Sequence, residues 1–224
     1  MFRLRNLFFG ITLMSSAYAQ TPPSDSDSDA YKAAYVLVCD LETRAKKAES
    51  LLLDNGRKKL SELNHRELSL LCKVYSEANE FNKQYEVAKE MWKMDPNAID
   101  SGLWMESSLI NQIGKSTTPE MINAFVDSAL NNGKGNRRIL LILKARSVLL
   151  RDGVLDTNKK KLAQDAMVEA SQVPIPDNIQ TWQIAELLPE VIIENDPLFK
   201  DYFTPEELTV LKLRLTQFKN KIRK

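Results

Sequence analysis

Histidine, cysteine and glycine are scarce in this sequence, and their scarcity narrows the chemistry open to it. The 224 residues include one histidine, two cysteines and seven glycines. The single histidine, His65, has no acidic or cysteine residue at metal-ligand spacing, so we expect neither a zinc site nor a histidine-dependent triad within one chain. The simplest expectation for His65 is a solvated, exposed residue in the first turn of a helix.

The short motifs of common cofactor-dependent enzymes are missing as well. The sequence contains no G-x-S-x-G, H-E-x-x-H, C-x-x-C, G-x-x-x-x-G-K or G-x-G-x-x-G, patterns that place a nucleophile, a metal or a phosphate at a defined turn. Seven glycines also leave little room for loops that cradle phosphate groups. We therefore expect a protein that is not an enzyme and that needs no cofactor.

Neither sign of charge is in excess. The chain has 31 Lys and Arg residues against 30 Asp and Glu residues, which gives a formal net charge of +1. No global field therefore attracts nucleic acid, and we expect no nucleic-acid partner. With 43% hydrophobic and 27% charged residues, the composition is that of a folded chain of one or two domains.

The N-terminus has the layout of a secretory signal. Arg3 and Arg5 precede an apolar run at residues 7–14, and a small-x-small tripeptide follows. This order predicts a signal peptide over residues 1–19, cleavage before Gln20, and a periplasmic or secreted protein. A membrane anchor is the alternative, but the run is far shorter than the roughly 20 residues of a spanning helix. We expect no stable membrane span after cleavage.

Residues 20–29 (QTPPSDSDSD) are rich in proline, serine and aspartate. Such a segment cannot bury apolar surface, which predicts a disordered, mobile linker. The aspartates could suggest a calcium loop, but the glycine turn and the terminal glutamate of such a loop are missing. Residues 30–224 are then expected to form the folded, helical domain.

Residues 65–97 predict two short amphipathic helices joined by a polar loop. Asn64 stands three residues before Glu67, the spacing of a capping box that begins a helix. The second helix should stop by Met94, because Pro96 cannot continue the hydrogen-bond ladder. The apolar residues of the first helix recur at steps of three and four and form one stripe: Leu68, Leu71, Cys72, Tyr75 and Ala78.

This two-helix unit resembles a tetratricopeptide repeat. The residues that carry the resemblance are Leu68, Leu71, Tyr75, Phe81 and the closing Asp95-Pro96-Asn97. The unit departs from the family pattern at Cys72 and Gln84, where small residues are usual, and at Ala88, where a large one is usual. The resemblance implies an all-α fold over residues 30–224. It would be a short right-handed solenoid of stacked antiparallel helical hairpins that binds a protein or a peptide.

Apolar stripes separated by Gly, Pro, Asn and Asp continue along the rest of the chain. The stretch 137–151 is apolar nearly all round, which predicts a central helix. After Pro189 the chain either continues a kinked helix or forms a separate turn, and Asp196-Pro197 opens a short helical turn. No stretch alternates apolar and polar residues, so we expect almost no strand. The other helices are expected at residues 30–53, 98–113, 118–132, 159–172, 178–188 and 204–222.

The polar side of the first helix in the tetratricopeptide-like unit is the expected partner-binding face. It carries Arg66, Ser69, Lys73 and Ser76, which lie opposite the apolar stripe. In stacked hairpins the first helices line the concave surface, and these donors suit a carboxylate or an acidic segment. The alternative is a merely solvated face.

Two alternatives are open for the cysteines. Cys39 and Cys72 both lie on apolar faces of expected helices in a chain that enters an oxidising compartment, so a disulfide is one outcome. Two separate buried thiols are the other outcome, because cysteine is among the most buried residue types.

Several remaining groups have both a functional and a structural interpretation. The acidic pairs Glu186 with Glu190 and Glu206 with Glu207 are of the kind a glycosidase uses, but they also suit helix caps and solvated faces. The three tryptophans can line a groove or fill a core, and the basic C-terminus can contact anions or complement a helix dipole. These residues are Trp92, Trp104, Trp182, Lys219, Lys221, Arg223 and Lys224.

Three hypotheses of function follow from these observations. The first is an exported, non-catalytic scaffold or assembly factor of the cell envelope that binds a protein or peptide. The second is a structural subunit held permanently in an envelope complex. The third is a helical hydrolase that uses the acidic pairs. Fold analogy carries the first hypothesis, and the sequence does not name the partner.

Overall fold

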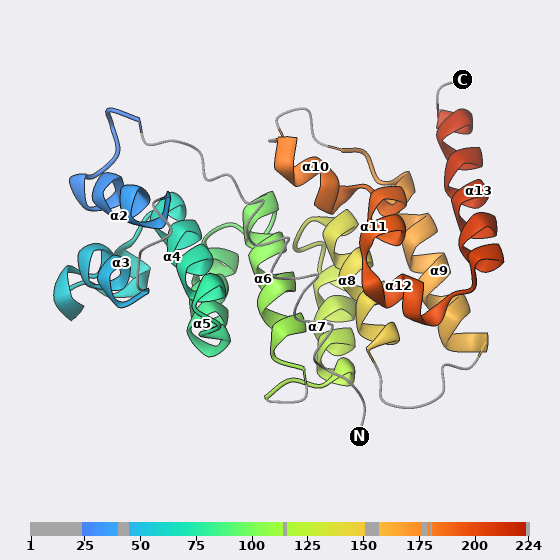
Figure 1. The fold of residues 1–224 in the computed structure, drawn as a ribbon, viewed down its shortest axis with the longest axis horizontal. Helices are drawn as coiled ribbons and strands as arrows, with labels where there is room; N and C mark the ends of the chain where they lie inside the picture. The colour runs from blue at the N-terminus through green and yellow to red at the C-terminus, as the bar shows by residue number, and fades with distance from the viewer. Residues whose placement is uncertain are drawn as a thin grey trace. The chain divides into compact units, whose positions relative to one another are not determined.

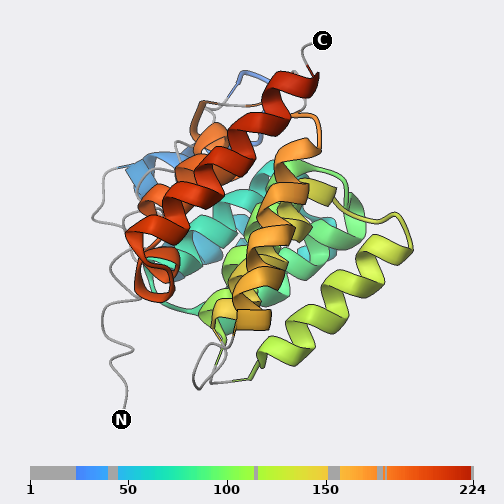
Figure 2. The same ribbon diagram turned by 90° about the vertical axis from the view of Figure 1, so that its right-hand side faces the viewer.

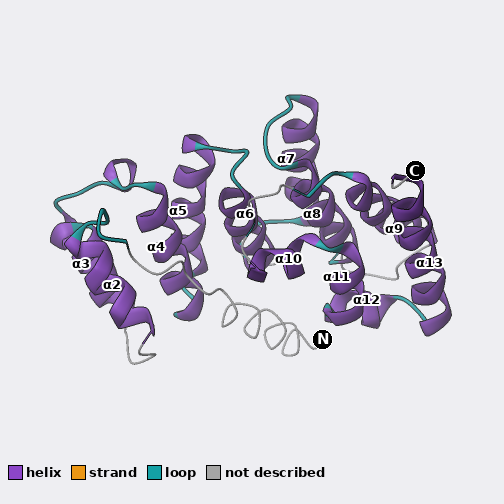
Figure 3. Ribbon diagram, turned by 90° about the horizontal axis from the view of Figure 1, so that it is seen from above, coloured by secondary structure: helices purple, strands orange, loops and turns teal. Residues whose placement is uncertain are grey.

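The computed structural model is all-helical in the part of the chain that it describes, which comprises residues 24–39, 45–113, 116–150, 157–175, 179 and 181–222. Within these residues the only β-type pairing is an isolated bridge between Ile113 and Thr117, and Figure 3 shows helices and loops alone. The all-α class and the near absence of strand are therefore confirmed. The described residues form two compact units, which we call the N-terminal unit (24–112) and the C-terminal unit (113–222).

Within its described residues the N-terminal unit contains five α-helices, and each packs on the next along the chain (Figure 1). The helix α4 also contacts α2 and α6. Two short 3-10 turns, Asp54–Gly56 and Leu60–Glu62, lead into α4. The helices are α2 (Asp29–Cys39), α3 (Ala45–Leu52), α4 (His65–Glu77), α5 (Phe81–Met94) and α6 (Ile99–Asn111).

The predicted single helix over residues 30–53 is wrong. The chain forms two helices, α2 and α3, which pack against each other. Tyr31 of α2 and Ala45, Ala48 and Leu52 of α3 are buried, and removing this apolar surface from water favours the packed arrangement. A continuous stripe in the sequence reveals the helical period but not where one helix ends and the next begins.

The hairpin of α4 and α5 begins and ends as the sequence predicts. The amide of Glu67 donates to Asn64 Oδ1 (3.0 Å) and the amide of Asn64 donates to Glu67 Oε2 (2.9 Å), which completes the capping box. At the other end of α4, Asn79 has a left-handed φ of 57°, and the amide of Glu80 donates to Tyr75 O (2.8 Å). This closure satisfies a helix-end carbonyl and turns the chain into α5.

The C-terminal unit contains seven α-helices within the described residues, and α8 packs between α7 and α9. Thr118 caps α7 through the amide of Met121 (3.3 Å), with Pro119 in the first turn, as predicted. Figure 2 shows the last helix, α13, lying beside α9. The helices are α7 (Pro119–Asn131), α8 (Arg137–Leu149), α9 (Thr157–Gln172), α10 (Thr181–Leu187), α11 (Pro189–Asn195), α12 (Pro197–Tyr202) and α13 (Pro205–Ile222).

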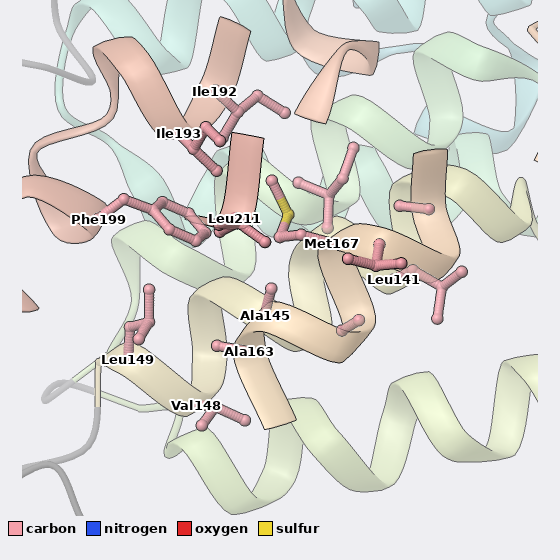
Figure 4. Close-up of a cluster of buried hydrophobic side chains, with 14 of the residues drawn as sticks. Leu141, Ala145, Val148, Leu149, Ala163, Met167, Ile192, Ile193, Phe199 and Leu211 are labelled. Atoms are coloured by element: carbon pink, nitrogen blue, oxygen red, sulfur yellow. The ribbon is translucent and has the colours of Figure 1, made fainter. Parts of the chain in front are cut away.

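The chain around Pro189 and Pro197 forms separate short helices. Pro189 is the first residue of α11, where its missing N–H costs no hydrogen bond, so the alternative of one kinked helix is excluded. Asp196 caps α12 by accepting from the amide of Leu198 (3.0 Å), which confirms the predicted turn. These short helices close the apolar core of the unit (Figure 4), whose buried members include Leu141, Ala145, Ala163, Met167, Ile192, Ile193, Phe199 and Leu211.

The helix α8 is buried on nearly every side, which confirms the predicted central helix, but two of its buried residues are arginines. The guanidinium of Arg138 donates to the backbone oxygens of Leu187 (2.9 Å), Ser171 (3.4 Å) and Val173. Arg146 Nε donates to Asp196 Oδ2 (2.8 Å). The two arginines thereby fasten α8 to chain segments that lie 33 to 50 residues further along.

Candidate functional site

The best-defined polar site of the N-terminal unit lies at the start of α4. The capping box fixes the first turn of this helix, from which the Arg66 side chain extends. Arg66 Nη1 donates to both carboxylate oxygens of Asp27, at 2.9 and 2.6 Å, and the guanidinium carbon lies 5.0 Å from the centre of the Tyr31 ring. Arginine thus uses its hydrogen-bond donors and its flat face at once.

Asp27 belongs to a tight turn of the segment before α2. Its amide donates to Ser24 O (3.1 Å), and its carboxylate accepts from the amide (2.6 Å) and the hydroxyl (2.9 Å) of Ser24. The hydrogen bond from the Ser24 amide, aided by the Ser24 hydroxyl and the charge of Arg66, lowers the pKa of Asp27 below its usual value. Asp27 is therefore ionised at neutral pH and presents two acceptors to Arg66.

Ser28 fixes where this turn meets the helices. Its hydroxyl accepts from the amide of Tyr31 (3.1 Å) at the start of α2, and it donates to Glu67 Oε1 (2.8 Å) in α4. Lys32 Nζ donates to the backbone oxygen of Asp25 (3.2 Å). We call residues 24–28 the acidic arm, and we call Tyr31, Lys32 and Arg66 the acidic-arm site.

Part of the predicted linker, residues 24–29, makes contacts with the helices in this structure. This stretch contains the acidic arm and Asp29, the first residue of α2. Its contacts are hydrogen bonds to an arginine and to helix ends rather than apolar burial, so composition does not reveal them. Residues 20–23 of the predicted linker, and the predicted signal peptide 1–19, lie outside the described residues.

The predicted partner-binding face is mostly buried. Of its four residues only Arg66 remains substantially accessible, because Ser69, Lys73 and Ser76 are only 7, 9 and 7% exposed. Trp104 of α6 donates from Nε1 to Ser69 Oγ (2.9 Å), so α6 lies across this side of α4. The expectation that Ser69, Lys73 and Ser76 line an open surface is wrong, since a helical period cannot show which later helix returns to cover a polar side.

His65 is not a solvated, exposed residue. It is half-buried, and its Nε2 lies 3.1 Å from the hydroxyl of Ser101 in α6. The same hydroxyl lies 3.2 Å from Met91 O in α5, to which it can donate. The contact ties together α4, α5 and α6 and gives His65 a structural role.

Cys72 is a free thiol in this structure, and the predicted disulfide with Cys39 is not formed. Its sulfur lies at the centre of the unit, 3.8 Å from Gln84 O and 3.9 Å from Met91 Sδ. Burial raises the pKa of the Cys72 thiol well above its usual value, which suppresses the reactive thiolate. The alternative of a separate buried thiol holds for Cys72. The side chain of Cys39 lies outside the described residues.

The four glutamates of the acidic pairs lie in different electrostatic surroundings. Glu207 accepts from Lys160 Nζ (2.8 and 3.0 Å) and from the amide of Thr204 (2.8 Å), and the Lys160 contact lowers its pKa. The pKa of Glu206 is lowered too, chiefly by a backbone hydrogen bond. A general acid requires the opposite shift. Burial raises the pKa of Glu186, beside the Arg146–Asp196 pair, and Glu190 lies in the first turn of α11.

The tryptophans have different surroundings. Trp104 is a core residue, as the structural interpretation predicts, and Trp92 is half-buried. The side chain of Trp182 lies outside the described residues. So do those of the basic C-terminal residues, so the predicted surface role of the last turn is not addressed by the structure.

One polar depression of about 350 Å³ opens beside the start of α9. Its charged side chains include the Lys160–Glu207 ion pair, which also places Lys160 Nζ 5.5 Å from the Phe203 ring centre. Two of its lining charges, those of Lys160 and Glu207, are therefore paired with each other. It is lined by Thr157, Lys160, Lys161, Gln164 and Glu207.

Among the residues that the structure describes, no group of three or more His, Cys, Asp and Glu side chains is placed to hold a metal ion. No described helix combines the length and the apolarity needed to cross a membrane.

Comparisons of the chain with protein-family models, with curated proteins and with solved structures found no match.

Proposed function

We propose that this protein is an exported, non-catalytic scaffold of the cell envelope that binds a protein or peptide partner. The observation that carries the proposal is the ion pair between Arg66 and Asp27. Through it, the helices already bind an irregular acidic segment. Arg66 is also the one residue of the predicted binding face that stays accessible, with 35% of its side chain exposed.

The architecture supports the same proposal. In both units helices pack mainly on their neighbours in sequence, as expected where each helical pair buries its apolar side against the next. We propose that these hairpins belong to a short right-handed solenoid of the tetratricopeptide kind, with α4 and α5 as its clearest repeat. Arrays of this kind present extended surfaces to peptides, which suits a scaffold or an assembly factor.

The proposed location is the periplasm or the exterior of the cell. The N-terminal order of basic, apolar and small residues supports it. The intact mass of the exported protein tests it. A chain that begins at Gln20 is expected, and a membrane-bound chain that keeps residues 1–19 would contradict the proposal.

Affinity capture from the exported fraction tests the binding function. The bait is the chain from residue 20 onward, compared with the variants Arg66→Glu and Arg57→Glu. Arg57 is a matched control, because its side chain is 83% exposed and its ion pair with Asp54 spans 4.0 Å. A specific partner should be recovered with the unaltered chain and with Arg57→Glu, but not with Arg66→Glu. Equal recovery with all three baits would contradict binding at Arg66.

A further inference from the structure

The acidic arm has the chemistry of a ligand rather than that of a packed element. Residues 24–27 contribute serine and aspartate side chains only, and none of these four residues is buried. The arm touches the rest of the unit through hydrogen bonds and charge. The acidic-arm site is different, since Tyr31 belongs to α2 and is 1% exposed.

We propose that the acidic arm is an in-cis competitor for the acidic-arm site, and that the partner is a peptide segment of the same chemistry. This inference rests on the proposed function. The segment would carry a hydroxyl residue three positions before a carboxylate, as Ser24 precedes Asp27. Its carboxylate takes the place of Asp27 on Arg66, and the arm is released.

The contacts are suited to exchange. In the Arg66–Asp27 pair the Arg66 side chain is 35% exposed and the Asp27 side chain is 10% exposed. An ion pair at a partly exposed arginine is weakened because water and salt compete for the arginine. The arm persists because it is tethered, which gives it a high effective concentration at the site. A partner that adds contacts elsewhere on the scaffold can overcome that advantage. The arm thus keeps acidic ligands that bind weakly from occupying the acidic-arm site.

The register of the arm makes the test specific. The sequence repeats Ser-Asp three times over residues 24–29, so three aspartates are chemically alike. Of these aspartates, Asp27 forms the ion pair with Arg66. Asp25 instead accepts a hydrogen bond from Lys32 through its backbone oxygen. Because the Ser28 hydroxyl holds the cap of α2 and bonds Glu67, a two-residue slip would break both contacts. Asp25 therefore cannot replace Asp27 without loss.

The experiment uses a fluorescein-labelled peptide with the sequence of residues 22–30 (PPSDSDSDA) and the chain from residue 20 onward. Fluorescence anisotropy gives Kd for the unaltered chain and for Asp27→Asn, Asp25→Asn and Asp27→Asn/Arg66→Gln. We expect Asp27→Asn to bind about three- to tenfold more tightly than the unaltered chain, since one charge-assisted contact of the competitor is lost. Asp25→Asn should stay within about twofold, because its side chain has no such contact.

Adding Arg66→Gln to Asp27→Asn should reverse the gain, and 0.5 M salt should weaken the binding to Asp27→Asn. Circular dichroism and thermal melting establish that each variant is folded. If a variant melts early, amide hydrogen exchange of the acidic arm in the unaltered chain, with and without the peptide, replaces it as the measurement. Equal affinity of Asp27→Asn and the unaltered chain, or a gain that survives Arg66→Gln, would overturn the competitor role.

These outcomes are separable from the fate of the proposed function. If partner capture depends on Arg66 while Asp27→Asn leaves peptide affinity unchanged, the scaffold function stands and the competition fails. If the peptide results hold but no exported protein is captured, the site is real and the scaffold function lacks its partner.

Discussion

The two units bury polar groups at their centres in different ways. In the N-terminal unit, Ser69 of α4 and Gln84 of α5 make neutral hydrogen bonds with Trp104 and Ser107 of α6. In the C-terminal unit, α8 buries Arg138 and Arg146, whose guanidinium groups bond to distant chain segments. The N-terminal unit also buries the charged residues Glu67, Lys73 and Glu106, but its Arg66 stays accessible.

These contacts also differ in how far apart their two residues lie in the sequence, and the separation is larger in the C-terminal unit. The α4–α5–α6 contacts join helices that follow one another, but Arg138 and Arg146 reach past α9 to the segments around α10 and α12. Buried charge is costly unless it is fully paired, so each of these arginines makes its unit depend on a distant carbonyl or carboxylate. Stability in the C-terminal unit should therefore be sensitive to single polar substitutions.

The largest effect is expected for Asp196→Ala. The change removes the carboxylate partner of buried Arg146 and the cap of α12, which leaves an uncompensated buried charge. We expect the free energy of unfolding to fall by about 4 kcal/mol, measured by urea denaturation. Asp201→Ala, at an exposed position nearby in sequence, is the control and should change it by less than about 0.5 kcal/mol. Equal losses of unfolding free energy in the two variants would show that the Arg146–Asp196 pair does not stabilise the unit.

Arg138→Met should follow, with a loss of about 3 kcal/mol. Methionine replaces the apolar stem of the arginine with an apolar side chain of similar length. It cannot donate hydrogen bonds, so the backbone oxygens of Ser171, Val173 and Leu187 lose their donor. Arg137→Met is a matched control one residue away, since the Arg137 side chain is 55% exposed and pairs with Glu169. Its expected cost is within about 0.5 kcal/mol. A small effect of Arg138→Met in denaturation would contradict the role assigned to this arginine.

Removing a neutral contact of the N-terminal unit should cost less. A double-mutant cycle of Trp104→Phe and Ser69→Ala isolates the indole–hydroxyl hydrogen bond from the change in ring size. We expect a coupling free energy of about 1 kcal/mol. A coupling as large as the Arg138 effect would erase the contrast between the two units.

The smallest effect is expected for Glu186→Gln, and it should be a gain. Burial raises the pKa of Glu186, so the folded chain binds its proton more tightly than the unfolded chain does. Stability is therefore lost as pH rises from the usual glutamate pKa through the raised value. The variant should melt higher than the unaltered protein at pH 7, and the difference should vanish below pH 4. A lower melting temperature at pH 7 would contradict the sign.

Local signals in the sequence were sufficient for the helix boundaries that depend on them. The Asn64–Glu67 capping box, the Thr118-Pro119 start and the central burial of α8 all follow from residues within one or two turns of each other. The apolar periodicity and the turn residues of 65–97 predicted two helices there, and the chain forms α4 and α5. These features depend on backbone hydrogen bonds that close over a few residues.

Contacts between distant residues could not be predicted in this way. Arg66 and Asp27 are 39 residues apart, and Arg146 and Asp196 are 50 apart. A composition-based view treats the Ser-Asp segment as solvated, and a helical wheel treats Ser69 and Lys73 as an open face, because neither method includes the helix or the arginine that meets them. The accessible site at Arg66 was predicted as a donor, but its occupant was not.

The most direct test of the account is millisecond hydrogen exchange of residues 24–31 in the chain from residue 20 onward, with and without saturating PPSDSDSDA peptide. If the peptide takes the place of Asp27 on Arg66, amide exchange in the acidic arm should rise on binding, while the first turn of α4 stays protected. Exchange in the arm that is unchanged or slower while the peptide is bound would contradict the claim that both occupy the acidic-arm site.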